Sequence, residues 1–154
     1  MKKEICIIIL IIVIIGGMLL FTNKDKNITI DINKISKDIM ENIKFEDELN
    51  KMDNDTVAKL YDINDATSQL VYMSSGATAE EIAIFEFKDK YECKIALEKA
   101  NNRIEEQKQN FKDYMPKEMK KLENAMIKNK NQYLIVCITN HPEEVGRILS
   151  KYLR

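Results

Sequence analysis

Residues 5–21 form the most uniform stretch of the chain, because they read ICIIILIIVIIGGMLLF and carry no charge. A helix rises about 1.5 Å per residue, so this run would span about 25 Å, near the lower limit for crossing the hydrocarbon core of a bilayer. The run has no polar face and is therefore unlike the amphipathic helices that cover a globular core. We expect residues 5–21 to form an uncleaved, single-pass transmembrane anchor behind a short cytoplasmic N-terminus at residues 1–4.

Two other interpretations of this run stay open, a cleaved secretory signal and a buried core helix. A cleaved signal usually has an apolar stretch of about 7–15 residues that ends in small residues of the A-x-A type. Here Gly16 and Gly17 are followed by MLLF, and Cys6 lies at the start of the run rather than after it, where a lipoprotein would need its cysteine. Lysines flank both ends, and the free α-amino group favours an N-terminus inside and the rest of the chain outside the cell membrane.

Beyond a polar linker at residues 22–30, the spacing of apolar residues predicts two helices. Asp31 is a suitable N-cap for an amphipathic helix of about a dozen residues, because isoleucines follow it at steps of three and four. These are Ile32, Ile35, Ile39 and Ile43. A second, shorter helix is predicted at residues 55–61, with Val57, Leu60 and Tyr61 on its apolar side.

The next segment predicts two strands followed by a long helix. Residues 69–74 and 81–88 are apolar on both faces, which indicates central strands or a sheet covered on both sides. A helix is expected at residues 89–114, ending before Pro116 because a proline disfavours helical geometry in the residue before it. Its apolar stripe, which should lie along the sheet, consists of Cys93, Leu97, Ala100, Ile104, Gln107, Phe111 and Tyr114.

The C-terminal part repeats this order. After a helical turn near residues 118–122, residues 125–128 and 132–139 predict a second hairpin, and a final helix opens at Pro142. The expected fold class is therefore α+β: two helices, then two β-β-α units that form a four-stranded antiparallel sheet with helices packed on it. We assign this domain to residues 31–154, outside the membrane.

Composition narrows the functional classes. The formal net charge is -1, which argues against a nucleic-acid partner. The chain has only three arginines, Arg103, Arg147 and Arg154, so dedicated recognition of phosphate or carboxylate is not indicated. Its one histidine gives a zinc site almost nothing to build from, and no cofactor, metal or catalytic residue is assigned. Cys93 and Cys137 are interpreted as buried thiols, although a disulfide between them stays open.

The segment YMSSGATAEEIAIFE, residues 72–86, offers the best candidate chemistry. A nucleophile elbow would need a second glycine and a phosphate loop would need a lysine, so small polar residues around one glycine favour a hairpin turn. A loop of this kind can bind a ligand through its amides and hydroxyls. The candidate ligand-binding residues are Ser74, Ser75, Gly76, Thr78, Glu80 and Glu81. The alternative is a small serine hydrolase that uses Ser74 or Ser75 with His141.

This segment and RIEEQKQNFKDYMPKEMKKLENA together resemble an uncharacterised family of small bacterial envelope proteins, a domain of unknown function that often follows a lipoprotein signal or an N-terminal anchor. The resemblance covers roughly residues 30–154 and implies an extracytoplasmic α+β domain in a Gram-positive-type bacterium, with no catalytic residues to carry over. We expect a non-enzymatic binding or accessory module, held in the membrane by residues 5–21, whose partner is an envelope protein, a peptide or a wall component. Self-association through the anchor and the first helix is a third hypothesis.

Overall fold

The structure is a computed structural model that describes residues 29–153. The expected cytoplasmic N-terminus, the anchor at residues 5–21 and most of the linker lie outside the described residues, so these predictions stay predictions. Within residues 29–153, none of the helices has the length and apolar character needed to cross a bilayer.

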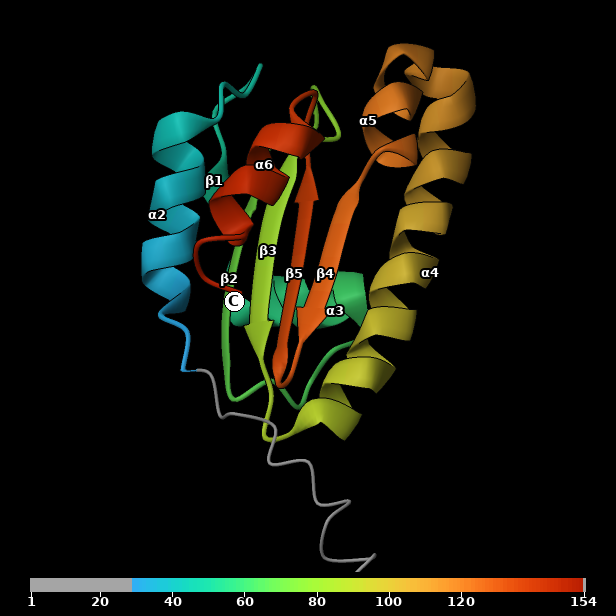
Figure 1. Cartoon of the computed structure of the whole chain (residues 1–154). Helices are drawn as coiled ribbons and strands as arrows, with labels where there is room; N and C mark the ends of the chain where they lie inside the picture. Colours follow the sequence, from blue (N-terminus) through green and yellow to red (C-terminus); the bar gives the residue numbers. More distant parts are fainter. Residues whose placement is uncertain (1–28, 154) are drawn as a thin grey trace, which may run out of the picture.

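The centre of the domain is an antiparallel sheet of five strands in the order β1-β2-β3-β5-β4 (Figure 1). The strands are β1 (Asn50–Lys51), β2 (Ser68–Met73), β3 (Glu81–Glu86), β4 (Met126–Lys130) and β5 (Tyr133–Ile138). All six residues of the central strand β3 pair with β2 on one side and with β5 on the other. The two expected hairpins therefore exist and lie side by side in one sheet.

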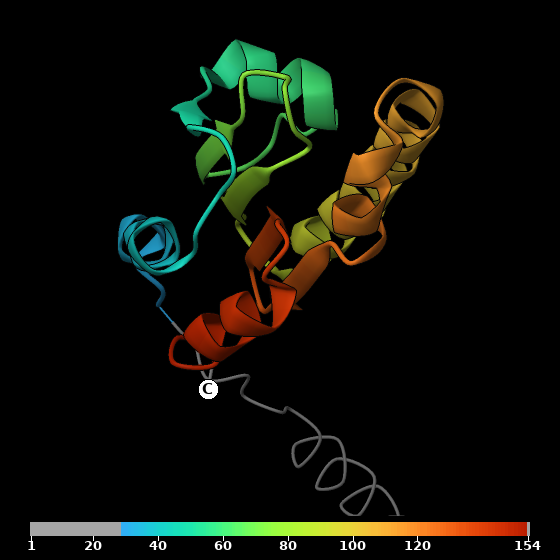
Figure 2. The same ribbon diagram turned by 90° about the horizontal axis from the view of Figure 1, so that it is seen from above.

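Helices cover both faces of the sheet, as the two apolar faces of the strands predict (Figure 2). They are α2 (Ile32–Asn42), α3 (Asn54–Tyr61), α4 (Lys90–Tyr114), α5 (Met119–Glu123) and α6 (Pro142–Leu149), with a 3-10 turn, η1 (Pro116–Glu118), before α5. Side chains of α2 and α6 form one apolar core with Ile82 and Ile84 of β3, whereas those of α3, α4 and α5 form another with Ala83 and Phe85. The result is a three-layer domain with two cores.

The two cysteines lie in different cores. Cys93 of α4 belongs to the core under α3 and α4, and Cys137 of β5 belongs to the core under α2 and α6. Both thiols are free and fully buried. Burial raises the pKa of Cys93 to about 11 and raises that of Cys137 still further. The interpretation as buried thiols is confirmed, and the sheet separates the two sulfur atoms.

Three sequence-based expectations are wrong in detail, and the first is Leu60, which is predicted on the apolar side of α3 but is 40% exposed. The sheet has five strands rather than four, because Asn50 and Lys51 add a short edge strand that pairs with Tyr72 and Met73. Two exposed residues leave no periodic pattern, so this strand has no signature in the sequence. Tyr114, predicted to continue the apolar stripe of α4, is 82% exposed. At about 1.5 Å per residue the 25-residue helix α4 is about 37 Å long, whereas the strands are about 20 Å long, so the sheet cannot cover the whole helix up to Tyr114.

The chain enters the domain at the end of the sheet opposite the β2–β3 connection. The N–H of Ile30 donates to the hydroxyl of Tyr133, which pairs with Glu86 at the far end of β3 from Glu81. Asp31 then caps α2 by accepting hydrogen bonds from the N–H groups of Asn33 and Lys34, as its position predicts. Figure 1 shows the start of α2 and the β2–β3 connection at opposite ends of the molecule.

Candidate ligand-binding site

Residues 74–80 connect β2 to β3 and form the hairpin turn that the sequence predicts. The Ser74 N–H donates to the Glu80 carbonyl at 3.1 Å, and the Ser74 hydroxyl donates to the Thr78 carbonyl at 2.6 Å. Gly76 has a φ of 94°, a conformation that costs residues with a Cβ free energy. The turn is therefore closed by its own polar groups, and its glycine is required by backbone geometry.

A second set of hydrogen bonds ties this turn to the segment that follows α2. Both the N–H and the hydroxyl of Ser75 donate to one carboxylate oxygen of Asp47, at 3.0 and 2.6 Å. These bonds lower the pKa of Asp47. The buried Glu80 carboxylate of the turn accepts hydrogen bonds from the N–H groups of Glu46 and Asp47, at 2.7 and 3.1 Å. The turn and the segment around residues 46–47 are thus linked in both directions.

The proposed hydrolase pair is not assembled. Both serine hydroxyls donate to acceptors within the turn or on Asp47, and His141 instead lies 3.6 Å from Glu144. Among residues 29–153, no hydrogen bond joins the histidine to either serine. His141 occupies the N-cap position of α6, but its side chain makes no capping hydrogen bond. Instead, its own N–H donates to the hydroxyl of Thr139.

Behind the turn lies a buried lysine surrounded by carboxylates. Lys121 of α5 is 2% exposed, and its Nζ lies 2.9 Å from Glu46, 3.0 Å from Glu118 and 3.7 Å from Glu80. Glu118 also accepts from the N–H of Ala79 at 2.8 Å. Burial lowers the pKa of Lys121, but the hydrogen bonds to Glu46 and Glu118 together with the charges of Glu80 and Glu118 outweigh it, so the net shift is upward. This cluster joins α5, the turn and the segment after α2.

A second buried cluster lies at the first residue of β3. The Glu81 carboxylate is fully buried, accepts from Nη2 of Arg103 at 2.9 Å, and accepts a short hydrogen bond from the Tyr61 hydroxyl. The guanidinium carbon of Arg103 lies 4.5 Å from the centre of the Tyr61 ring, in cation–π geometry. Burial raises the pKa of Glu81 despite the opposing effect of Arg103, and burial with the nearby Glu81 charge raises that of Tyr61 well above its usual value.

Between the turn and α4 lies a hollow of about 230 Å³ that we call the Arg103 groove. It is lined by Leu60, Met73, Ser74, Gly76, Thr78, Ala79, Glu80, Arg103, Glu106, Gln107, Asn110 and Phe111. Of the six candidate residues, four line this groove: Ser74, Gly76, Thr78 and Glu80. Ser75 faces Asp47, and Glu81 lies in the buried cluster with Arg103.

Several buried polar atoms at this groove have no hydrogen-bond partner. They are Nε and Nη1 of Arg103, Oε1 of Gln107 and Oε1 of Glu80, the last of which lies only near the Lys121 charge. An unpaired buried polar atom costs about 1–3 kcal/mol, so such atoms commonly mark places where water or a ligand binds. Arg103 is not among the candidate residues that the sequence predicts. The available signals were a polar residue, Gln107, within an apolar stripe, and an arginine in a chain whose basic residues are almost all lysines.

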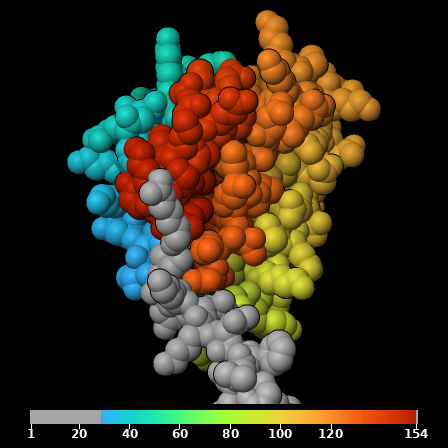
Figure 3. Space-filling view, viewed as in Figure 1, coloured from blue at the N-terminus to red at the C-terminus, as the bar shows by residue number. Residues whose placement is uncertain are grey.

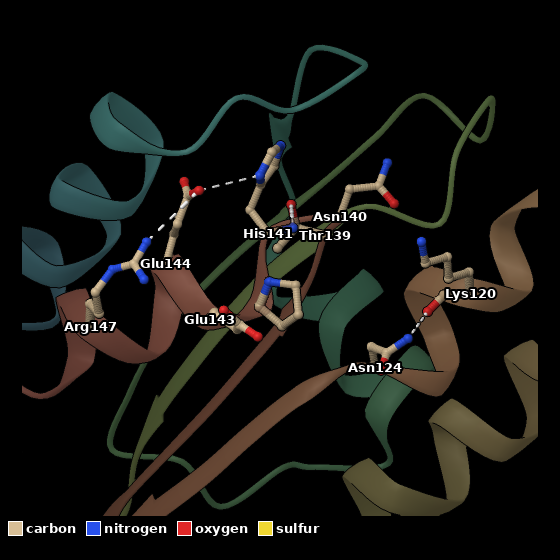
Figure 4. A pocket seen from close by; sticks show the side chains of 9 residues that line it. Lys120, Asn124, Thr139, Asn140, His141, Glu143, Glu144 and Arg147 are labelled. Atoms are coloured by element: carbon tan, nitrogen blue, oxygen red, sulfur yellow. Dashed lines mark hydrogen bonds and ion pairs between the residues drawn. The ribbon is translucent and has the colours of Figure 1, made fainter.

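A second hollow, of about 280 Å³, surrounds His141 at the start of α6 (Figure 4). Its polar side chains have partners inside and outside the hollow: Glu144 lies 3.6 Å from His141 and 3.9 Å from Arg147, the Asn140 amide donates to Glu46, and the Asn124 amide donates to the main-chain carbonyl of Lys120. In the space-filling view, α6 (red) lies between α2 (blue) and the orange surface of β4 and α5 (Figure 3). Because no unpaired buried group points to a ligand there, we consider the Arg103 groove the stronger candidate.

Comparison with known proteins gives one match. The family model DUF4358, a domain of unknown function, matches residues 41–139, which is more than half of the chain. No curated protein and no solved structure matches. The matched segment includes every residue that lines the Arg103 groove, whereas most residues that line the His141 hollow follow it.

Proposed function

We propose, from the premise that this chain belongs to the DUF4358 family of domains of unknown function, that it is a non-enzymatic ligand-binding module of the cell envelope. The observation that carries this proposal is the Arg103 groove, where buried donors and acceptors without partners meet a hollow large enough for a small ligand. Binding sites are typically concave and partly apolar, with a few convergent polar groups, and the groove has all three features.

The groove is supported by a rigid frame. The Lys121 cluster fixes the turn from behind, and the Arg103–Glu81 pair fixes α4 to the first residue of β3. Because the polar groups are held by other buried groups, little conformational entropy would be lost when a ligand binds. A catalytic serine would instead need a base within hydrogen-bond reach, and both serine hydroxyls are occupied elsewhere.

The proposed location is the outer face of the cell membrane, with residues 5–21 as anchor and residues 1–4 inside. The support is the charge-free apolar run in the sequence and its length. We infer that the partner is an envelope protein, a peptide or a wall component. Protease added to intact cells should then degrade the domain, and the full-length protein should sediment with membranes. A full-length protein that remains soluble and protease-resistant in intact cells would contradict this location.

Hydrogen–deuterium exchange of the full-length protein in membrane vesicles tests the binding function. Envelope extract should slow amide exchange in residues 74–80 and in the groove-facing turns of α4, residues 103–111. A His141→Ala variant, altered in the other hollow, serves as the matched control and should show the same protection. Unchanged exchange in both segments, or protection confined to the residues around His141, would contradict the proposal.

A further inference from the structure

Arg103 is an unusual residue for its position, because a charged side chain that is 5% exposed normally has all its polar atoms paired. Its Nη2 donates a hydrogen bond to Glu81 and lies 3.8 Å from the sulfur of Met73, whereas Nε and Nη1 have no acceptor. Tyr61 covers one face of the guanidinium. The structure thus fixes one part of the guanidinium and leaves donors on the rest of it unused.

The surroundings of these donors set the charge of an occupant. Arg103 has one carboxylate partner, Glu81, while Lys121 is already surrounded by three. Glu106 also lines the groove and is exposed. A doubly charged phosphate would meet the repulsion of these carboxylates, whereas a singly charged, planar carboxylate matches the guanidinium in shape and charge.

The remaining groups of the groove indicate two further features of the ligand, a hydrogen-bond donor and an apolar group. Oε1 of Gln107, one turn after Arg103 on α4, is a buried acceptor that needs a donor such as an amide N–H. Met73, Leu60 and Phe111 provide apolar contact surface. Leu60 is 40% exposed and, like Arg103, also lines a neighbouring hollow.

We propose that the Arg103 groove binds the C-terminal residue of a peptide, with the terminal carboxylate on the free N–H groups of Arg103, the amide N–H on Gln107, and an apolar side chain against Met73 and Phe111. The inference rests on the proposed binding function. The volume of about 230 Å³ is below the about 300–1,000 Å³ of sites for drug-sized ligands, which suits one or two residues. A free amino acid shares the carboxylate chemistry but lacks the amide N–H.

The test is a titration of the full-length protein in detergent micelles, followed by the NMR signal of the Arg103 Nε–H group. The probes are N-acetyl-L-leucine, N-acetyl-L-leucinamide and L-leucine, which differ in the carboxylate and in the amide. N-acetyl-L-leucine should shift the signal and bind at least about tenfold more tightly than the carboxamide, the ratio expected when a hydrogen bond to a charged group is lost. L-Leucine should bind more weakly than the acetylated probe.

Two variants complete the test. Gln107→Met keeps the length of the side chain but removes the acceptor, and it should weaken binding of N-acetyl-L-leucine about fivefold to tenfold, consistent with loss of one neutral hydrogen bond. Arg147→Lys, in the His141 hollow, is the matched control and should bind as the wild type does. Because the Nε–H signal is read in the wild type, the result does not depend on whether a variant folds.

Equal affinity for acid and carboxamide, stronger binding of L-leucine than of the acetylated probe, or a signal unmoved by all three would overturn the inference. An unchanged Nε–H signal would mean that the free N–H groups of Arg103 bind only ordered water. If envelope extract still protected residues 74–80 from exchange, the binding function would stand and only the ligand class would be wrong. If neither experiment gave a response, both proposals would fail.

Discussion

Replacing Lys121 by methionine removes the cation that two buried carboxylates share. The Glu80 side chain is fully buried and that of Glu118 is 8% exposed, so neither can be solvated in its place. Removing one partner of a buried ion pair typically costs about 3–5 kcal/mol, because the remaining charge is left uncompensated. Glu46 adds little to this figure, because its side chain is 54% exposed and solvent screens it.

The matched control is Lys120→Met, one residue earlier on α5. Lys120 is exposed, and an exposed substitution is expected to change the free energy of unfolding by no more than about 0.5 kcal/mol. A domain of this size has a total stability of about 5–15 kcal/mol, so the loss at Lys121 should be large enough to measure and should leave the protein partly folded at worst.

The assay is urea unfolding of the full-length protein in mild detergent, followed by circular dichroism at several pH values. The urea concentration at the unfolding midpoint should be lower for the Lys121→Met variant than for the wild type, and the slope of the free energy of unfolding against urea should be the same for both. The pKa of Lys121 is raised, so its contribution is complete below the ordinary lysine pKa of 10.5 and is lost as pH rises past that value. A loss below 1 kcal/mol at pH 7, equal to that of Lys120→Met, would refute the reasoning.

Three further predictions concern other parts of the site and the core. Tyr61→Phe removes a hydrogen bond to the buried Glu81 carboxylate and should lower the free energy of unfolding by about 1.5–3 kcal/mol at pH 8, measured in urea. Because burial raises the pKa of Glu81, the loss should become smaller as the pH is lowered and the carboxylate takes up a proton; a loss that does not change with pH would contradict this. In Gly76→Ala the added Cβ would contact no neighbouring atom, so the expected loss of about 1–2 kcal/mol in the free energy of unfolding comes from the backbone φ of 94° alone. An unchanged melting temperature would argue against that conformation. In a Cys6→Ser background, maleimide should label neither Cys93 nor Cys137 until urea is added, whereas an intact mass that revealed a disulfide between them would contradict their placement in separate cores.

The elements of the fold could be predicted where burial imposes a period on the sequence. The isoleucines of α2 and the alternation of Ala83 and Phe85 with Ile84 in β3 follow directly from which face is covered. Asp31 and Pro142 mark helix starts because their side chains suit those positions chemically. The edge strand β1 could not be predicted, because the pairing of two exposed residues depends on main-chain hydrogen bonds, which leave no pattern of side chains in the sequence.

The candidate site could be predicted only in part, because a site joins residues that are distant in the sequence. The turn at residues 74–80 was visible as a local cluster of small polar residues. Arg103, by contrast, is 22 residues from its partner Glu81, and only the packing of α4 on the sheet brings them together. A basic residue on a helix usually faces solvent, so the local sequence does not show that Arg103 is buried against Glu81.

The point where the chain enters the domain and the Arg103 groove lie at opposite ends of β3. Ile30 bonds to Tyr133 beside Glu86, whereas the Arg103 groove lies beside Glu81, five residues away along β3. At about 3.4 Å per residue these two ends are about 17 Å apart. In a chain tethered at residues 5–21, the mouth of the groove would therefore open on the side remote from the tether. A peptide could then approach from the surrounding medium without first passing between the domain and the lipid headgroups.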